Sequence, residues 1–214
     1  MTTPTPPRGC FIALEGIDGC GKTTTTKALA EWLPTSGLMP SGAKLVVTRE
    51  PGGTALGAEI RKLLLHPLNV PTPTTELLLF TADRAQHVET IIKPALAAGD
   101  WVLCDRYTGS TVAYQGYGRG IDLGLIASLE QVATSGLKPD LTLWLYLSVE
   151  ESLARRKTKT NDHIESAGEA FLKRVAAGFA DIACKNWHLI DAHQTANAVL
   201  SDCQKTIQLY FPHQ

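Results

Sequence analysis

The stretch that decides the fold runs from residue 10 to residue 24 and reads CFIALEGIDGCGKTT. It consists of an apolar run, a glycine-rich turn and a Lys-Thr pair that opens a helical pattern. Four of its residues match the phosphate-binding loop pattern G-x-x-x-x-G-K-[ST], namely Gly16, Gly21, Lys22 and Thr23. The pattern predicts a loop between a strand and a helix that binds nucleotide phosphates; the alternative is an ordinary glycine turn before a helix.

The residue types of this loop suit that chemistry. Glycines let backbone N–H groups approach phosphate oxygens because no Cβ is in the way, and the following helix directs its positive N-terminal end at the same anion. We expect Lys22 to contact the β and γ phosphates and the Thr23 hydroxyl to ligate Mg²⁺. The predicted nucleotide-binding residues are Gly16, Ile17, Asp18, Gly19, Cys20, Gly21, Lys22, Thr23 and Thr24.

Length and composition favour one globular domain. The chain has 214 residues, of which 44% are hydrophobic and 19% charged, with a formal net charge of −1. This near-neutral balance argues against nucleic acid or a membrane surface as the main partner, and the apolar runs have the length of strands rather than of membrane spans. We expect residues 1–8 to be a flexible tail without the features of a secretory signal, and residues 9–214 to form the domain.

The cysteine pattern predicts a cytoplasmic protein. Five cysteines are scattered along the chain without C-x-x-C spacing, which is typical of reduced thiols rather than of a disulfide framework or zinc site. Cys20 has two interpretations, because a thiol at a helix N-terminus can be reactive and a small residue can simply fill the loop.

Short apolar strands alternate with helical patterns along the whole chain. Strands are expected at residues 10–14, 44–48, 101–104, 141–147 and 187–190. Helices are expected at residues 22–33, 56–65, 76–87 (capped by Thr74 or Thr75 and resuming to residue 98), 121–134, from the capping box Ser148 to Glu151 onward, 170–184 and 195–210. This alternation predicts an α/β fold with a five-stranded parallel sheet covered by helices on both faces. Ligands of such folds bind beyond the carboxyl ends of the strands, where Arg49, Glu50, Asp105 and Arg106 follow their strands.

Three features distinguish among proteins with such a loop. The chain has no N-K-x-D motif, which guanine-specific GTPases use to bind the base. Motor ATPases have Asp-Glu at the end of a strand, whereas the third strand here ends with Asp105-Arg106-Tyr107. An arginine here can bind a second phosphate, as transfer to a phosphorylated acceptor requires. Asp105 can hold Mg²⁺ through water, or it can pair with Arg106 and merely close the loop.

Arginines and one aromatic residue predict the acceptor site. Arginine suits bidentate binding of a phosphate or a base edge. Phe80 and Arg84 are four residues apart and share a helix face, so they could stack on a planar base and donate to its carbonyl. Phe80 could equally belong to the core. The arginines in question are Arg49, Arg61, Arg84, Arg106 and Arg119.

A basic stretch at residues 155–159 predicts a lid over the nucleotide. A lid of this kind, at approximately residues 154–168, would add positive charge to the transferring phosphoryl group and exclude water. The alternative is that the basic residues only offset the helix dipole. The cations are Arg155, Arg156, Lys157 and Lys159.

Together these segments resemble the bacterial type of the thymidylate kinase (dTMP kinase) family over residues 11–210. The resemblance rests on EGIDGCGKTT (15–24), TREPGGT (48–54), LFTADR (79–84), DRY (105–107), AYQGYGRG (113–120) and PDLT (139–142). It implies the P-loop nucleoside-monophosphate-kinase fold. It also implies a homodimer whose subunits contact each other through helices beside the sheet. Many bacterial relatives read Asp-Arg-Ile-Glu in the lid, whereas residues 162–165 here read DHIE.

The resemblance also implies roles for individual residues. Arg49 and Arg106 would clamp the dTMP phosphate, Phe80 would stack on thymine and Arg84 would contact its carbonyl. Gln115 or a bound water would satisfy the ring N3–H, and Tyr114 would help to exclude a ribose hydroxyl. The full acceptor set is Asp18, Arg49, Glu50, Arg61, Phe80, Arg84, Arg106, Ser110, Thr111, Tyr114 and Gln115. Members of the family have either an arginine inside the phosphate-binding loop or basic residues in the lid. Residues 17–20 contain no cation, so the resemblance implies the lid type. The implied catalytic cations are Lys22, Arg106, Arg155 and Arg156.

These inferences predict ATP- and Mg²⁺-dependent phosphorylation of dTMP to dTDP. Two alternatives stay open at this point. One is a P-loop kinase for another nucleotide or nucleoside, and the other is a non-catalytic nucleotide-binding module.

Overall fold

The core of the fold is a parallel sheet of five strands, as predicted. The computed structural model describes residues 8–65, 69–156, 168–183 and 186–211. In it the strands follow the order β2-β3-β1-β4-β5 and every neighbouring pair is parallel. The strands are β1 (Phe11–Glu15), β2 (Leu45–Arg49), β3 (Trp101–Asp105), β4 (Leu141–Tyr146) and β5 (Trp187–Asp191).

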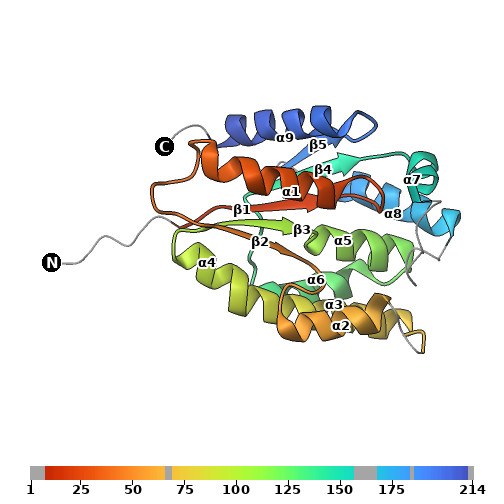
Figure 1. Ribbon diagram of the computed structural model, residues 1–214. Helices are drawn as coiled ribbons and strands as arrows, with labels where there is room; N and C mark the ends of the chain where they lie inside the picture. Colours follow the sequence, from red (N-terminus) through yellow and green to blue (C-terminus); the bar gives the residue numbers. More distant parts are fainter. Residues whose placement is uncertain (1–7, 66–68, 157–167, 184–185, 212–214) are drawn as a thin grey trace.

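Helices cover both faces of this sheet (Figure 1). In the view of Figure 1, α1 and α9 lie above the sheet, and α2, α3, α4 and α6 lie below it. The helices are α1 (Lys22–Trp32), α2 (Ala55–Leu65), α3 (Pro73–His87), α4 (Lys93–Ala97), α5 (Thr108–Thr111), α6 (Leu123–Thr134), α7 (Val149–Arg156), α8 (Glu169–Ile182) and α9 (Ala196–Tyr210). Three further helical turns are η1 (Leu33–Thr35), η2 (Val88–Ile92) and η3 (Val112–Gly118).

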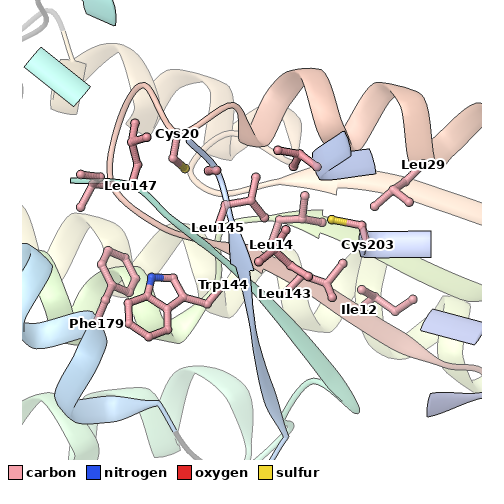
Figure 2. Close-up of a cluster of buried hydrophobic side chains, with 14 of the residues drawn as sticks. Ile12, Leu14, Cys20, Leu29, Leu143, Trp144, Leu145, Leu147, Phe179 and Cys203 are labelled. Atoms are coloured by element: carbon pink, nitrogen blue, oxygen red, sulfur yellow. The ribbon is translucent and has the colours of Figure 1, made fainter. Parts of the chain in front are cut away.

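Successive residues of the central strand enter the cores on opposite faces, because side chains alternate along a strand. Ile12 and Leu14 pack with Leu29 of α1 and Cys203 of α9 (Figure 2). Phe11 and Ala13 pack on the other side with η2 and α4. Both faces of β1 are thus buried, which explains why its first four residues, 11–14, are all apolar.

The segment from Thr108 to Gly118 forms helical turns that the sequence pattern did not predict. Glycine and β-branched residues in this segment have low helix propensity. Tertiary packing overrides that propensity: a Cβ at Gly109 would lie 2.6 Å from the Trp187 ring, and one at Gly118 would lie 2.6 Å from Phe171. The segment η3 packs extensively against α8.

The start of α3 corrects a second expectation. Its N-cap is Thr72 rather than Thr74 or Thr75, and the Thr72 hydroxyl accepts a hydrogen bond from the Thr75 backbone N–H at 3.3 Å. Pro73 occupies the first helical position, where a missing N–H costs nothing. Of the helices that the structure describes, none is long and apolar enough to cross a membrane.

Candidate active site

The carboxyl ends of β1, β2 and β3 meet at one edge of the sheet, as predicted. Strand register places Asp105 beside Leu14 on one side and beside Arg49 on the other. A cavity of about 590 Å³ opens there, within the range of small-molecule sites. Predicted residues that line it include residues 18–24, Arg49, Asp105, Arg106, Arg155 and Arg156.

The loop after β1 has the backbone that a phosphate cradle needs. Gly16 has a φ of 139° and Gly21 a φ of 99°, values that side-chain-bearing residues rarely adopt. A Cβ at Gly16 would also lie 2.5 Å from the Leu145 carbonyl oxygen, whereas one at Gly21 would meet only open space. Of the predicted nucleotide-binding residues, Gly16 and Ile17 do not line the cavity, and the Ile17 side chain is buried in the core.

Lys22 lies folded over its own loop. Its Nζ donates to the carbonyl oxygens of Gly16 at 2.9 Å and Ile17 at 3.0 Å, and it lies 3.7 Å from the Cys20 sulfur. Cys20 is itself buried inside the loop. The lysine charge is therefore held against the backbone of the loop, next to the buried Cys20 side chain.

A hydroxyl and a carboxylate lie together where α1 faces β3. The Thr23 hydroxyl donates to Asp105 Oδ2 at 3.0 Å. Oxygen ligands of this kind suit Mg²⁺, which keeps several water ligands and needs few side chains. No cluster of three or more His, Cys, Asp or Glu side chains forms a metal site within the described ranges. The donor set therefore fits a magnesium ion bound together with phosphates and water.

Arg106 connects the phosphate loop to the acceptor side. Its Nη1 donates to Ser110 Oγ at 2.8 Å and to the Gly16 carbonyl oxygen at 3.1 Å, while Nη2 forms an ion pair with Asp18. The Tyr114 hydroxyl donates to the other Asp18 oxygen at 2.7 Å. Burial opposes ionisation of Asp18, but the charges of Arg106 and Lys22 and the Tyr114 hydrogen bond outweigh it and lower its pKa to about 2.

Glu15 holds the turn that carries Arg106. Its carboxylate accepts from the backbone N–H of Tyr107 at 2.9 Å and from the N–H and hydroxyl of Ser110 at 3.0 and 2.6 Å. These bonds keep Arg106 at a φ of 75°, a left-handed conformation that is uncommon outside glycine. Burial raises the pKa of Glu15. Sequence reasoning missed this residue, although a charge at the end of an apolar strand was a signal.

A narrow cavity of about 100 Å³ adjoins the first and is lined by most of the predicted base-site residues. Phe80 and Arg84 both line it from the same face of α3, as their spacing predicted. Phe80 is half-buried and packs against the core, as one interpretation expected, and its stacking on a base stays a prediction. The other predicted residues that line it are Asp18, Glu50, Arg61, Arg106, Ser110, Thr111, Tyr114 and Gln115.

Arg84 is held by a buried network of charges. Its Nε donates to Glu50 at 2.7 Å, and its Nη1 donates to Thr111 at 2.7 Å and pairs with Glu130. The second Glu50 oxygen bonds to His87 Nδ1 at 2.9 Å. The side chains of Arg84 and Glu50 are each only 2% exposed, so these pairs are shielded from water. The sequence pattern did not predict that Glu130 and His87 belong to this network.

The remaining predicted arginines divide into two groups. Arg61 lines both cavities and donates to the Pro51 carbonyl oxygen at 2.9 Å. Arg49 is exposed at the first cavity. Arg119 lines neither cavity that is described here, because its guanidinium instead pairs with Glu76 at 2.8 Å.

The start of the predicted lid is helical. Arg155 and Arg156 lie in the last turn of α7, where Arg155 donates to the Ala192 carbonyl oxygen at 3.0 Å. The Arg156 side chain packs beside Gly19 of the loop. Lys157, Lys159 and residues 162–165 lie outside the described residues.

Comparisons with known proteins agree with this geometry. The family model for thymidylate kinase matches residues 14–203. Thymidylate kinase of Synechococcus sp. (strain CC9605) is 61% identical over 203 residues, covering 94% of this chain and 97% of that protein. Its counterpart in Prochlorococcus marinus (strain MIT 9303) is 58% identical, covering 95% of each chain. The crystal structure of thymidylate kinase from Ehrlichia chaffeensis superposes with a TM-score of 0.76 at 37% identity, covering 94% of this chain and all of that one. The chain therefore belongs to the thymidylate kinase family.

Proposed function

We propose that this protein transfers the γ-phosphoryl group of ATP to dTMP, giving ADP and dTDP. The observation that carries the proposal is the position of Arg106 between two adjoining cavities, one lined by the phosphate loop and one by Phe80 and Arg84. A guanidinium at this junction suits an acceptor that already bears a phosphate. The family membership supports the same reaction.

ATP and Mg²⁺ fit the larger cavity. The glycine cradle and the N-terminus of α1 suit the triphosphate, with the Lys22 ammonium group at its centre. Thr23 would hold Mg²⁺, with Asp105 acting through water. The ion, when bound, would neutralise charge on the phosphate oxygens.

The dTMP site would use side chains from several elements. Arg49 and Arg106 would bind the phosphate and Phe80 would stack on the base. Arg84 would donate to the carbonyl oxygen of the base. Asp18 and Tyr114 would lie near the sugar, and the carbons of Tyr114 would crowd a ribose 2′-hydroxyl. Glu50, Arg61, Ser110, Thr111 and Gln115 would complete the pocket.

Catalysis would consist of positioning and charge stabilisation. An oxygen of the dTMP phosphate attacks the γ-phosphorus in line, while the bond between that phosphorus and the β–γ bridging oxygen breaks. No side chain needs to act as a general base. Lys22 and Arg106 would stabilise the charge on the transferring group, and Arg155 or Arg156 would add to it from the lid side.

We further propose that residues 9–214 form a single domain with a lid at about residues 154–168. We also propose a homodimer formed through helices beside the sheet. The four cysteines that the structure describes carry free thiols, which suits a cytoplasmic location.

An acceptor panel tests the proposed function. Purified protein is incubated with ATP, Mg²⁺ and one of dTMP, dUMP, dCMP, dAMP, dGMP or thymidine, and ADP formation is measured. The expected result is the highest kcat/KM with dTMP. Preferred transfer to another acceptor, or ATP binding without transfer to any of them, would contradict the proposal.

A further inference from the structure

Glu76, in the first turn of α3, is a buried carboxylate that the proposed reaction does not use. It is 1% exposed and lines neither of the two cavities described above. Three donors bind it: Gln115 Nε2 at 2.9 Å, Arg119 Nε at 3.1 Å and Arg119 Nη2 at 2.8 Å. Burying a charge is costly unless it is paired, and these three hydrogen bonds compensate the charge of Glu76.

The carboxylate fixes which end of the Gln115 amide faces the narrow cavity. A primary amide has an acceptor oxygen and a donor nitrogen that differ little in shape, and their hydrogen-bond partners decide the orientation. An ionised carboxylate can only accept, so the amide nitrogen must point to Glu76. Within the described ranges no group donates to Gln115 Oε1, and Gln115 lines the cavity. The cavity is therefore presented with a hydrogen-bond acceptor.

Arg84 presents the opposite polarity to the same cavity. Its Nε and Nη1 are bound to Glu50, Thr111 and Glu130, and the guanidinium has no acceptor atom. Whatever part of it reaches a ligand can only donate. The narrow cavity thus offers one fixed acceptor and one fixed donor.

This polarity distinguishes the two kinds of pyrimidine. Thymine and uracil carry a donor at N3–H next to an acceptor at the C4 carbonyl, whereas cytosine carries an acceptor at N3 next to a donor amino group. We infer that Glu76 is a specificity-determining positioning residue, which orients Gln115 so that the site selects 4-oxo over 4-amino pyrimidine monophosphates. The inference rests on the proposed function and specifies how its base pocket reads the acceptor.

Arg119 makes the orientation rigid. It binds both oxygens of Glu76, which prevents the carboxylate from rotating away from Gln115. Its guanidinium carbon also lies 4.8 Å from the centre of the Phe171 ring of α8. A helix beyond the pocket therefore supports the Gln115 amide through two charged side chains.

The test replaces Glu76 by glutamine, which keeps the shape and removes the charge. The amide of Glu76→Gln can donate to Gln115 Oε1, so Gln115 is free to turn its nitrogen toward the ligand. The probe is 5-methyl-2′-deoxycytidine monophosphate, which keeps the methyl group of dTMP and changes only the N3 and C4 groups. Sites that hydrogen-bond a substrate can reject an analogue that lacks the matching groups by about 10⁴-fold. For the wild-type protein, kcat/KM with dTMP is therefore expected to exceed kcat/KM with the probe by about 10⁴-fold.

In Glu76→Gln the ratio of these two kcat/KM values is expected to fall at least about tenfold while the KM for ATP changes little. The thermal midpoint is expected to fall as well, because Arg119 loses its buried anionic partner. The double variant Glu76→Gln/Gln115→Leu separates an effect on base selection from an effect on folding. The effects of two mutations are not additive when the two residues act together. In a Gln115→Leu background, the Glu76→Gln change should leave the ratio where Gln115→Leu alone puts it. Glu59→Gln is the matched control, since it makes the same change in an exposed pair with Lys62.

The outcomes separate the inference from the proposed function. A folded Glu76→Gln protein with an unchanged ratio would overturn the inference even if dTMP remains the best acceptor. Equal losses with both acceptors would show a merely structural role and would overturn it as well. Failure of the wild-type protein to phosphorylate dTMP would instead contradict the proposed function.

Discussion

The two halves of the site are built in different ways. The proposed donor half, which would bind ATP, is one contiguous loop at residues 16–24, and residues 18–24 of it line the larger cavity. The acceptor half draws side chains from the turn after β2 and from α3, η3 and α6, and these meet as buried ion pairs. Changes in the donor half should therefore affect chemistry with little effect on folding, whereas changes in the acceptor half should affect both.

The largest expected effect is that of Lys22→Ala in the donor half. The variant loses a charge that would stabilise the transferring phosphoryl group, so kcat should fall by roughly 10³-fold or more. The Lys22 side chain of the wild-type protein donates to two backbone carbonyls of the loop, so the unfolding free energy of the variant should fall by only about 1 kcal/mol. Steady-state kinetics and urea unfolding measure both. Lys27→Ala, an exposed change on the same helix, is the control, and near-normal turnover in Lys22→Ala would refute the loop assignment.

Arg84→Ala is the corresponding change in the acceptor half. It leaves Glu50 and Glu130 buried without their cation, so the unfolding free energy should fall by about 3–5 kcal/mol. The KM for dTMP should rise far more than the KM for ATP. Arg84→Lys keeps the charge and loses the planar fork, so it should retain more stability and still show the selective rise in KM. Equal changes in both KM values would place Arg84 outside the base pocket.

Asp105→Asn tests whether Asp105 contributes to the binding of Mg²⁺ in the donor half. The Mg²⁺ concentration for half-maximal activity should rise by roughly 10-fold, because groups that act on a metal through water typically contribute 10- to 100-fold. The KM for dTMP should be unaffected. A titration of activity against Mg²⁺ gives both values, and an unchanged Mg²⁺ requirement would indicate that Asp105 only closes the loop through Thr23.

The smallest expected effect concerns Asp83, beside the acceptor network. Burial and the neighbouring Glu50 carboxylate raise its pKa from 3.8 to about 6. Because the folded pKa is the higher one, the stabilising contribution is complete below about pH 3.8 and is lost as the pH rises past about 6. At pH 7.5 the native state therefore bears an unfavourable buried charge.

Asp83→Asn removes that charge and keeps the oxygen that accepts from the Gly52 N–H at 3.0 Å. The variant should be more stable than the wild type by about 1–2 kcal/mol at pH 7.5, and the difference should shrink at pH 5. Urea unfolding at the two pH values measures it. A variant that is less stable at pH 7.5 would show that the Asp83 charge contributes favourably.

The same contrast explains what the sequence could predict. The glycine loop between β1 and α1, the parallel sheet and the shared face of Phe80 and Arg84 depend on local spacing, and the structure confirms them. The parts of Glu15, Glu76 and Glu130 depend on contacts with residues 39 to 95 positions away, which no local pattern contains. The helical turns of residues 108–118 were missed for the same reason, since packing against α8 overrides their weak helix propensity.

Protein groups alone orient Arg84 and Gln115, and we therefore expect the acceptor half to be built before ATP arrives. Calorimetric titration of the wild-type protein with dTMP, in the absence of ATP and Mg²⁺, distinguishes a preformed acceptor half from one that ATP has to order. We predict saturable binding of dTMP, with no measurable binding of 5-methyl-2′-deoxycytidine monophosphate under the same conditions. Binding of dTMP only when the ATP site is filled, or equal binding of the two acceptors, would contradict the account.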